Sequence, residues 1–173
     1  MPHTAKLIPV CFVLLLCPLQ VNAQWSTITH KGDDGNNPGT TVAYTVNSGG
    51  YSMEIYIDTV NAIRGRFSLP DGLLAFPEKF CPSYQIDRGT PINRSINDAP
   101  CISTSQWVEY IIGHIDGSKI ISTSLLALMN GISITFRFKL SNNDYRETVF
   151  SLQGSKRAVT SAFGENVTVT KSP

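Results

Sequence analysis

The sequence predicts an all-β fold, either an antiparallel β-sandwich or a small barrel, with one or two short helices. Three observations support this fold class. Apolar and polar side chains alternate with a period of two in several runs, clusters of glycine, asparagine and aspartate separate some of the runs, and helical periodicity is confined to two short segments. Many strands and few helices are typical of two packed β layers.

The first hairpin is predicted from two runs separated by a glycine-rich segment. The run 51–57 alternates apolar and polar side chains, from Tyr51 to Ile57, and the run 41–46 precedes it. Between them lies Asn47-Ser48-Gly49-Gly50, which readily adopts positive φ angles. We therefore expect these two runs to pair as antiparallel strands.

Three further strands are expected in the middle of the chain. Ile63–Leu69 and Tyr84–Ile86 are short candidates. Trp107–Ile115 is apolar on both faces, as is typical of a strand at the centre of a sandwich.

The two predicted helices are both short. Ser124 is placed to cap a helix that ends at Asn130-Gly131. A second helix is expected to begin at Ser155 and to end at Gly164, with Val159 on its apolar face.

The runs 132–140 and 145–152 predict a second hairpin, joined by Asn142-Asn143-Asp144. This three-residue loop places Phe136 opposite Phe150 and a lysine opposite a glutamate. A four-residue loop would shift every pair by one residue, set two basic side chains opposite each other and bury a carboxylate. We therefore expect the three-residue loop.

Composition indicates one compact domain and argues against some classes of function. Of the 173 residues, 42% are hydrophobic and 16% are charged, which is enough apolar surface for one core. The formal net charge of +1 argues against a general nucleic-acid or membrane-surface binder. Charge is nevertheless uneven, because residues 24–60 carry a net charge of −3 and residues 124–173 a net charge of +3.

Residues 1–23 have the pattern of a secretory signal. The apolar run Leu7–Leu19 is followed by the small-residue ending Val21-Asn22-Ala23. That run is shorter than the roughly 20 residues of a spanning helix, so no transmembrane anchor is expected. A lipoprotein signal at Cys17 is the less favoured alternative, because a bulky leucine precedes it. We expect residues 24–173 to form one periplasmic or secreted domain.

The cysteines that remain after signal removal are Cys81 and Cys101. In an oxidising compartment we expect them to form a disulfide, which contributes about 3 kcal/mol for a loop of this length. No metal site is expected, because these cysteines, His30 and His114 are scattered along the chain. No cofactor is expected either.

Catalytic motifs of serine hydrolases, zinc proteases, phosphate-binding loops and dithiol enzymes are absent from the sequence. His114 lies two residues before Asp116 with serines nearby, but the two share a strand face only if the strand continues through Asp116-Gly117, which reads as a turn. We therefore expect no enzyme activity. A hydrolase built around His114 remains the less favoured alternative.

The first candidate binding site is the start of the second helix. The first amides of a helix lack intrahelical partners, and here Lys156 and Arg157 follow Ser155 at that end. An anion would gain charge-assisted hydrogen bonds there, and Arg146 on the preceding hairpin would extend the same patch. The alternative is a solvated helix end whose cations pair with a neighbouring carboxylate.

The second candidate is the turn Asp87-Arg88-Gly89, inside the loop that the disulfide closes. A loop held rigid in this way is suited to partner recognition. The alternative is that Asp87 only braces the turn through local backbone hydrogen bonds.

One family resemblance adds to this interpretation. The segment Phe67–Leu74, followed by Gln85–Pro91 and Cys101, is similar to the middle of the invasion-associated locus B family of bacterial exported proteins. So is the order in which Phe150–Gly154 leads into a helix, and the similarity spans residues 63–164. Family members carry a further cysteine pair towards the N-terminus, which this chain lacks. The resemblance implies a periplasmic or secreted β-rich domain without established catalysis, and it assigns no active-site residue.

The sequence therefore predicts a non-catalytic periplasmic or secreted domain that binds a protein or an anionic component of the cell envelope, and not nucleic acid. The alternative is a small inhibitor of an envelope-degrading enzyme such as a lysozyme, because such inhibitors can also be compact, disulfide-linked β domains with a rigid loop.

Overall fold

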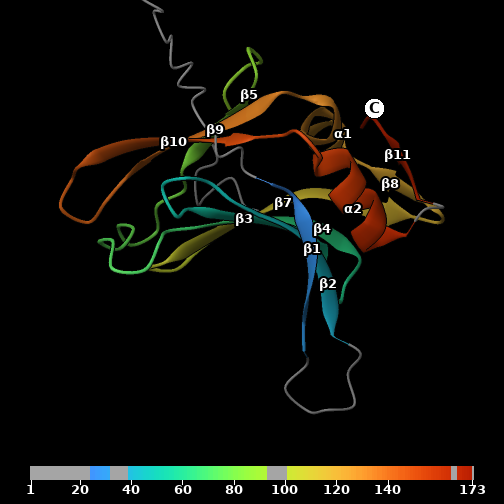
Figure 1. Cartoon of the computed structure of the whole chain (residues 1–173), viewed down its shortest axis with the longest axis horizontal. Helices are drawn as coiled ribbons and strands as arrows, with labels where there is room; N and C mark the ends of the chain where they lie inside the picture. The colour runs from blue at the N-terminus through green and yellow to red at the C-terminus, as the bar shows by residue number, and fades with distance from the viewer. Residues whose placement is uncertain (1–23, 32–38, 93–100, 165–166, 173) are drawn as a thin grey trace, which may run out of the picture.

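The computed structural model describes residues 24–31, 39–92, 101–164 and 167–172 (Figure 1). The predicted signal segment 1–23 lies outside these residues. Among the helices that are described, none is long and apolar enough to cross a membrane. The elements in chain order are β1 (Ser26–His30), β2 (Thr40–Val46), β3 (Ser52–Ile57), β4 (Ala62–Ser68), β5 (Ser83–Ile86), β6 (Cys101–Ser103), β7 (Trp107–Asp116), β8 (Lys119–Ile121), α1 (Thr123–Asn130), β9 (Ser133–Lys139), β10 (Tyr145–Ser151), α2 (Ser155–Phe163) and β11 (Thr168–Thr170).

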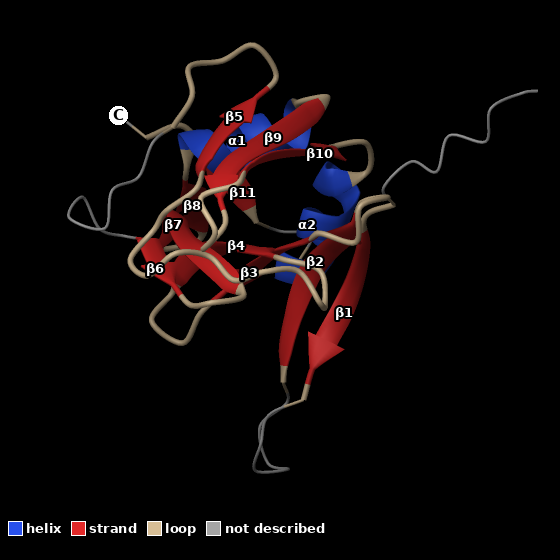
Figure 2. Ribbon diagram, turned by 90° about the vertical axis from the view of Figure 1, so that its left-hand side faces the viewer, coloured by secondary structure: helices blue, strands red, loops and turns tan. Residues whose placement is uncertain are grey.

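The strands form two sheets, as the all-β prediction requires. Sheet A is curled and has the order β1-β2-β3-β4-β7-β8-β11, with β6 also paired to β7 (Figure 2). Sheet B has the order β10-β9-β5 and is antiparallel. Sheet A is mixed, because β11 runs parallel to β8. Helix α2 packs against β1, β2 and β3, and α1 packs against β7 and β11, so the helices extend the layer that covers sheet A.

The core between the two layers is centred on an aromatic cluster. Phe67 of β4 is fully buried, and its ring stacks on that of Phe136 in β9 with centroids 4.3 Å apart. Phe138 and Phe150 of sheet B meet the same ring edge-on. One side chain of sheet A therefore contacts three phenylalanines of sheet B, which fixes how the two layers face each other.

The first predicted hairpin is confirmed. Val46 lies opposite Ser52, and the intervening turn is held by the Asn47 carboxamide, whose Oδ1 accepts hydrogen bonds from the amides of Gly49 and Tyr51. Its last loop residue, a glycine, has φ +77°, the left-handed conformation that the glycine-rich segment was expected to supply.

The register predicted for the second hairpin is wrong by two residues. Phe150 lies opposite Ile134, whereas the prediction placed it opposite Phe136. The loop does contain three residues, but it starts one residue earlier, because Leu140 pairs with Asp144 and Asn143 adopts the left-handed conformation at φ +67°. The shift is even, so the same side chains still face the core.

Both predicted helices are present, with one correction at a cap. The first is capped by Ser122 and not by Ser124, because the Ser122 hydroxyl accepts a hydrogen bond from the amide of Leu125. The second runs from Ser155 to Phe163 as predicted.

A further correction concerns Ile132, which is 80% exposed although the alternation placed it on the buried face.

Candidate functional site

The predicted anion site at the start of α2 retains two free cations. Lys156 and Arg157 are exposed, and within the described residues neither makes an ion pair. They border a surface hollow of about 690 Å³ that runs along the outer side of the helix. The other lining residues are small or carry hydroxyls: Gly154, Thr160, Ser161 and Gly164.

The chain enters this helix through a glycine whose positive φ angle other residues rarely adopt. Gly154 has φ +90°, which lets β10 turn directly into α2, and it supplies no side-chain cap. The first helical hydrogen bond runs from the amide of Ala158 to the carbonyl of Gly154. The amides of Lys156 and Arg157 precede that bond, so they lie at the positive end of the helix dipole.

Two other residues predicted for this site do not contribute as expected. Ser155 is fully buried, and its hydroxyl donates a 2.8 Å hydrogen bond to the carbonyl of Leu128, so it is not available to a ligand. Arg146 lies at the opposite end of β10, near the hairpin tip, about 17 Å along the strand from Ser151. It pairs there with Asp144 at 2.6 Å, and the structure does not bring it to α2.

The turn after β5, the second predicted site, is held in place by Asp87. One carboxylate oxygen, Oδ1, accepts hydrogen bonds from the amides of Ile132 and Ser133, 2.9 and 2.8 Å away. Asp87 therefore braces the turn, as the alternative expected, but through the start of β9 rather than locally. Arg88 is exposed, and the described residues offer it no ion pair.

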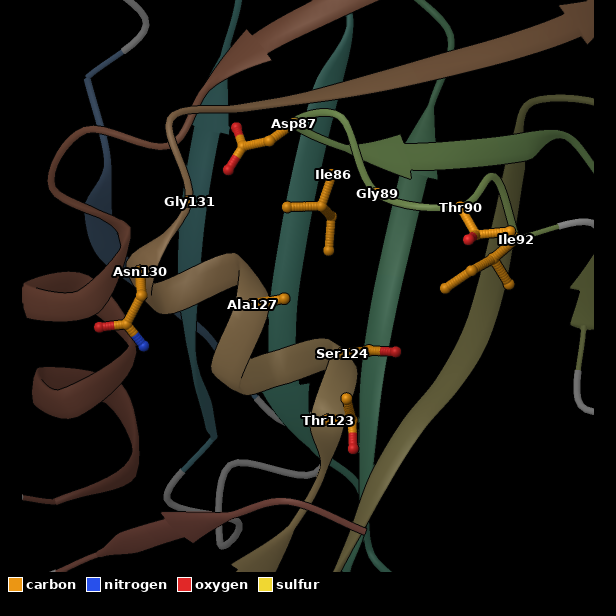
Figure 3. A pocket seen from close by; sticks show the side chains of 10 residues that line it. All are labelled: Ile86, Asp87, Gly89, Thr90, Ile92, Thr123, Ser124, Ala127, Asn130 and Gly131. Atoms are coloured by element: carbon orange, nitrogen blue, oxygen red, sulfur yellow. The ribbon is translucent and has the colours of Figure 1, made fainter.

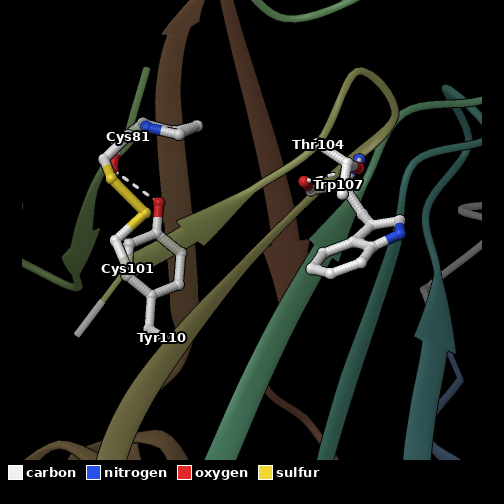
Figure 4. Close-up of a disulfide and its surroundings, with 6 residues drawn as sticks. Cys81, Cys101, Thr104, Trp107 and Tyr110 are labelled. Atoms are coloured by element: carbon white, nitrogen blue, oxygen red, sulfur yellow. Dashed lines mark hydrogen bonds between the residues drawn. A yellow bond between two sulfur atoms is a disulfide. The ribbon is translucent and has the colours of Figure 1, made fainter. Parts of the chain in front are cut away.

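The predicted disulfide lies at the other end of β5 from this turn. Cys81 and Cys101 are joined, with Cα atoms 6.4 Å apart (Figure 4). Beside them the buried hydroxyl of Tyr110 donates a 2.6 Å hydrogen bond to the carbonyl of Pro82. The segment before β5 is thereby fixed to β6 and β7 of sheet A.

The hydrolase alternative depended on His114, and one expectation about it is wrong. Strand β7 continues through Asp116, and the turn begins only at Gly117, so His114 and Asp116 do share a face. Both side chains are exposed. Within the described residues no hydrogen bond joins His114 to Asp116 or to a serine. Nor do these residues include a group of three or more acidic, histidine or cysteine side chains that would hold a metal ion.

The outer face of sheet A carries a set of charges that the sequence analysis did not identify. We call it the charge cluster. Glu54 of β3 and Glu109 of β7 lie on either side of Arg66 in β4, because the strand registers set all three in one row. The members of the charge cluster are His30, Glu54, Tyr56, Asp58, Arg64, Arg66 and Glu109.

Arg66 is the centre of the charge cluster. Its Nε and Nη2 donate to one oxygen of Glu109 at 3.1 and 2.9 Å, and its Nη1 lies 3.6 Å from Glu54. The guanidinium also lies over the rings of Tyr56 and Trp107, at 5.3 and 4.7 Å from their centroids. Because both carboxylates hold the same cation, its orientation is fixed.

The protonation states of the charge cluster follow from these contacts. Burial, and then the hydrogen bond that Tyr56 donates to Glu109, raise the pKa of Tyr56 above its usual value. Burial alone would lower the pKa of Arg66, but the hydrogen bonds to Glu109 outweigh this effect, so its pKa is raised. Asp58 shows the same competition, because burial raises its pKa while hydrogen bonds from the Ala62 amide and other donors lower it overall.

The Glu109 carboxylate is engaged by other members of the charge cluster. The Glu109 side chain is 8% exposed; one of its oxygens accepts hydrogen bonds from Tyr56 and Arg66, and the other lies 3.4 Å from Arg64. Its lone pairs are thus engaged within the fold, which leaves little capacity to activate a water molecule. In the sequence, the only indication of the charge cluster was a single glutamate within the apolar run Trp107–Ile115. Its role could be recognised only once the order of β3, β4 and β7 was known.

No family model matches the chain, and no curated protein or solved structure matches it either. The functional interpretation therefore depends on the residues and their geometry.

Proposed function

We propose that this chain is a non-catalytic domain, exported to the periplasm or secreted, that binds an anionic macromolecular partner along α2. The observation that supports this proposal is the hollow beside α2, where Lys156 and Arg157 lie without an ion-pair partner among the described residues. A protein with an acidic surface or an anionic polymer of the cell envelope has the complementary chemistry.

The environment of the two cations favours a bound anion over a merely solvated surface. Placing positive side chains at the positive end of a helix costs about 0.3 to 1 kcal/mol per charge when they are exposed. A bound anion removes that cost and gains hydrogen bonds from the side chains and from the free amides. The hydroxyls of Thr160 and Ser161, one turn further on, add donors along the same hollow.

Export and family are further proposals. The signal-like segment 1–23 and the disulfide between Cys81 and Cys101 support a periplasmic or extracellular location. The resemblance of residues 63–164 to the invasion-associated locus B family agrees with an exported β-rich domain.

The test uses a polyanion and two charge-matched double variants. Poly-glutamate is titrated against the wild-type protein, against Lys156→Ala/Arg157→Ala, and against Lys139→Ala/Arg146→Ala as the control. We expect the first variant alone to bind at least about tenfold more weakly, with a salt dependence reduced by about one unit for each cation removed.

Two results would contradict the proposal. If the two variants lose affinity equally, binding follows net charge and not the α2 site. If a DNA duplex of equal charge binds as tightly as poly-glutamate, the α2 site does not distinguish an acidic protein or an envelope polymer from nucleic acid.

The turn at Asp87 favours a second candidate function, an inhibitor of an envelope-degrading enzyme. This turn projects beyond the end of β5 (Figures 1 and 2). It is braced by β9, and Arg88 in it is exposed. A rigid exposed loop loses little conformational entropy on binding an enzyme cleft. Titration against lysozymes tests it, and an absence of inhibition at micromolar protein would eliminate this candidate.

A further inference from the structure

A second hollow of about 490 Å³ lies between α1 and the turn that follows β5 (Figure 3). Its volume falls in the range of small-molecule sites, roughly 300 to 1,000 Å³. One wall is a face of α1, and the opposite wall comes from β5 and the turn.

Asp87 is the charged residue among those lining this hollow. Its Oδ1 is held by two backbone amides, but its Oδ2 makes no hydrogen bond or ion pair with the described residues. The fold therefore fixes one oxygen of the carboxylate and leaves the other able to accept a hydrogen bond from a ligand. An oriented carboxylate of this kind is suited to a cationic donor.

The position of this carboxylate relative to α1 strengthens the preference for a cation. A Cβ placed on Gly131, the C-cap residue that follows α1, would lie 3.0 Å from Oδ2 of Asp87. The C-terminal end of a helix carries a partial negative charge. The last turn of α1 contains no basic residue, so a carboxylate and the negative end of a helix dipole meet at one edge of the hollow.

The rest of the lining is aliphatic or neutral. Ile86, Ile92 and Ala127 point into the hollow from its two walls, and Thr90 and Ser124 contribute hydroxyls. No lysine or arginine is among the lining residues. The hollow thus combines one negative corner with a short apolar surface.

We propose that this hollow binds the primary ammonium group of a small alkylamine, with the ammonium on Asp87 and the alkyl chain against Ile86, Ile92 and Ala127. The site is separate from the proposed anion site on α2 and has the opposite charge preference. A lysine side chain of a peptide presents the same chemistry.

The experiment titrates n-butylammonium chloride into the wild-type protein at low salt and follows backbone amide shifts by NMR. n-Butanol and sodium butyrate serve as neutral and anionic probes of equal chain length. We expect saturable shifts at residues 86–92 and 123–131 for the ammonium only. Nα-acetyl-lysine amide is measured in parallel, and the tighter of the two amines identifies a free amine or a peptide lysine as the source.

Asp87→Asn is the discriminating variant, because its carboxamide oxygen still accepts from the Ile132 and Ser133 amides while the charge is removed. We expect its affinity for butylammonium to fall at least about fivefold, whereas Asp71→Asn, in another exposed turn, binds as wild type does. Ala127→Leu, which fills the hollow without changing charge, should also abolish binding. Equal binding of butanol and butylammonium, or unchanged affinity in Asp87→Asn, would overturn the proposal.

Discussion

Replacing Glu109 by glutamine tests the charge cluster on sheet A. The substitution keeps the shape of the side chain but removes the charge that faces Arg66 at 2.9 Å and Arg64 at 3.4 Å. Losing one partner of a buried ion pair costs about 3 to 5 kcal/mol, because the other charge is left uncompensated. We expect the lower end, about 3 kcal/mol, because Arg66 remains 31% exposed and still has Glu54 3.6 Å away.

The assay is urea unfolding of Glu109→Gln beside a matched control. Glu147→Gln removes the same group from an ion pair with Arg137 whose partners are 54% and 44% exposed, so it should cost no more than about 1 kcal/mol. The thermal midpoint of Glu109→Gln should fall by roughly 10 °C. If the two variants lose similar stability, the ion pairs of Glu109 with Arg64 and Arg66 stabilise sheet A no more than an exposed pair does.

Three further outcomes are expected. Phe67→Ala should destabilise the fold by about 3 to 5 kcal/mol in the same unfolding assay, because its ring joins sheet A to phenylalanines of sheet B; a loss below about 1 kcal/mol would contradict this packing. Reducing the bond between Cys81 and Cys101 should cost about 3 kcal/mol, and an unchanged midpoint in reductant would refute it. The pKa of Asp58 is lower in the folded state, so its stabilisation is present above pH 3.8 and is lost as pH falls through the folded-state value. The acid-induced fall in stability should therefore be shallower in Asp58→Asn, and an equal fall would contradict it.

The strands that the sequence predicted best are those with a full period-two pattern and a distinctive turn. The hairpin of β2 and β3 has both, and Asn47 and Gly50 determine its turn locally. The β9–β10 hairpin offers two adjacent asparagines, and only the folded chain shows that Asn143 takes the positive φ angle. Strands of three to five residues, such as β1 and β11, have no pattern of their own and form because a neighbour provides an edge.

The candidate sites were predictable only where neighbouring residues in sequence define them. Lys156 and Arg157 share a helix end, so their position could be inferred from the helix alone. Arg146 could not be placed, because its distance from α2 depends on the length and direction of β10. The charge cluster joins residues more than forty positions apart, and its row exists only because β4 lies between β3 and β7.

The most direct test of the proposed function is an NMR map of where poly-glutamate contacts the protein. The amides of residues 154–164, which carry two cations, should shift on titration, and those of residues 137–146, which carry three cations on the β9–β10 hairpin, should remain in place. Shifts that gather on the hairpin, or that spread evenly over the basic residues, would contradict a binding site on α2.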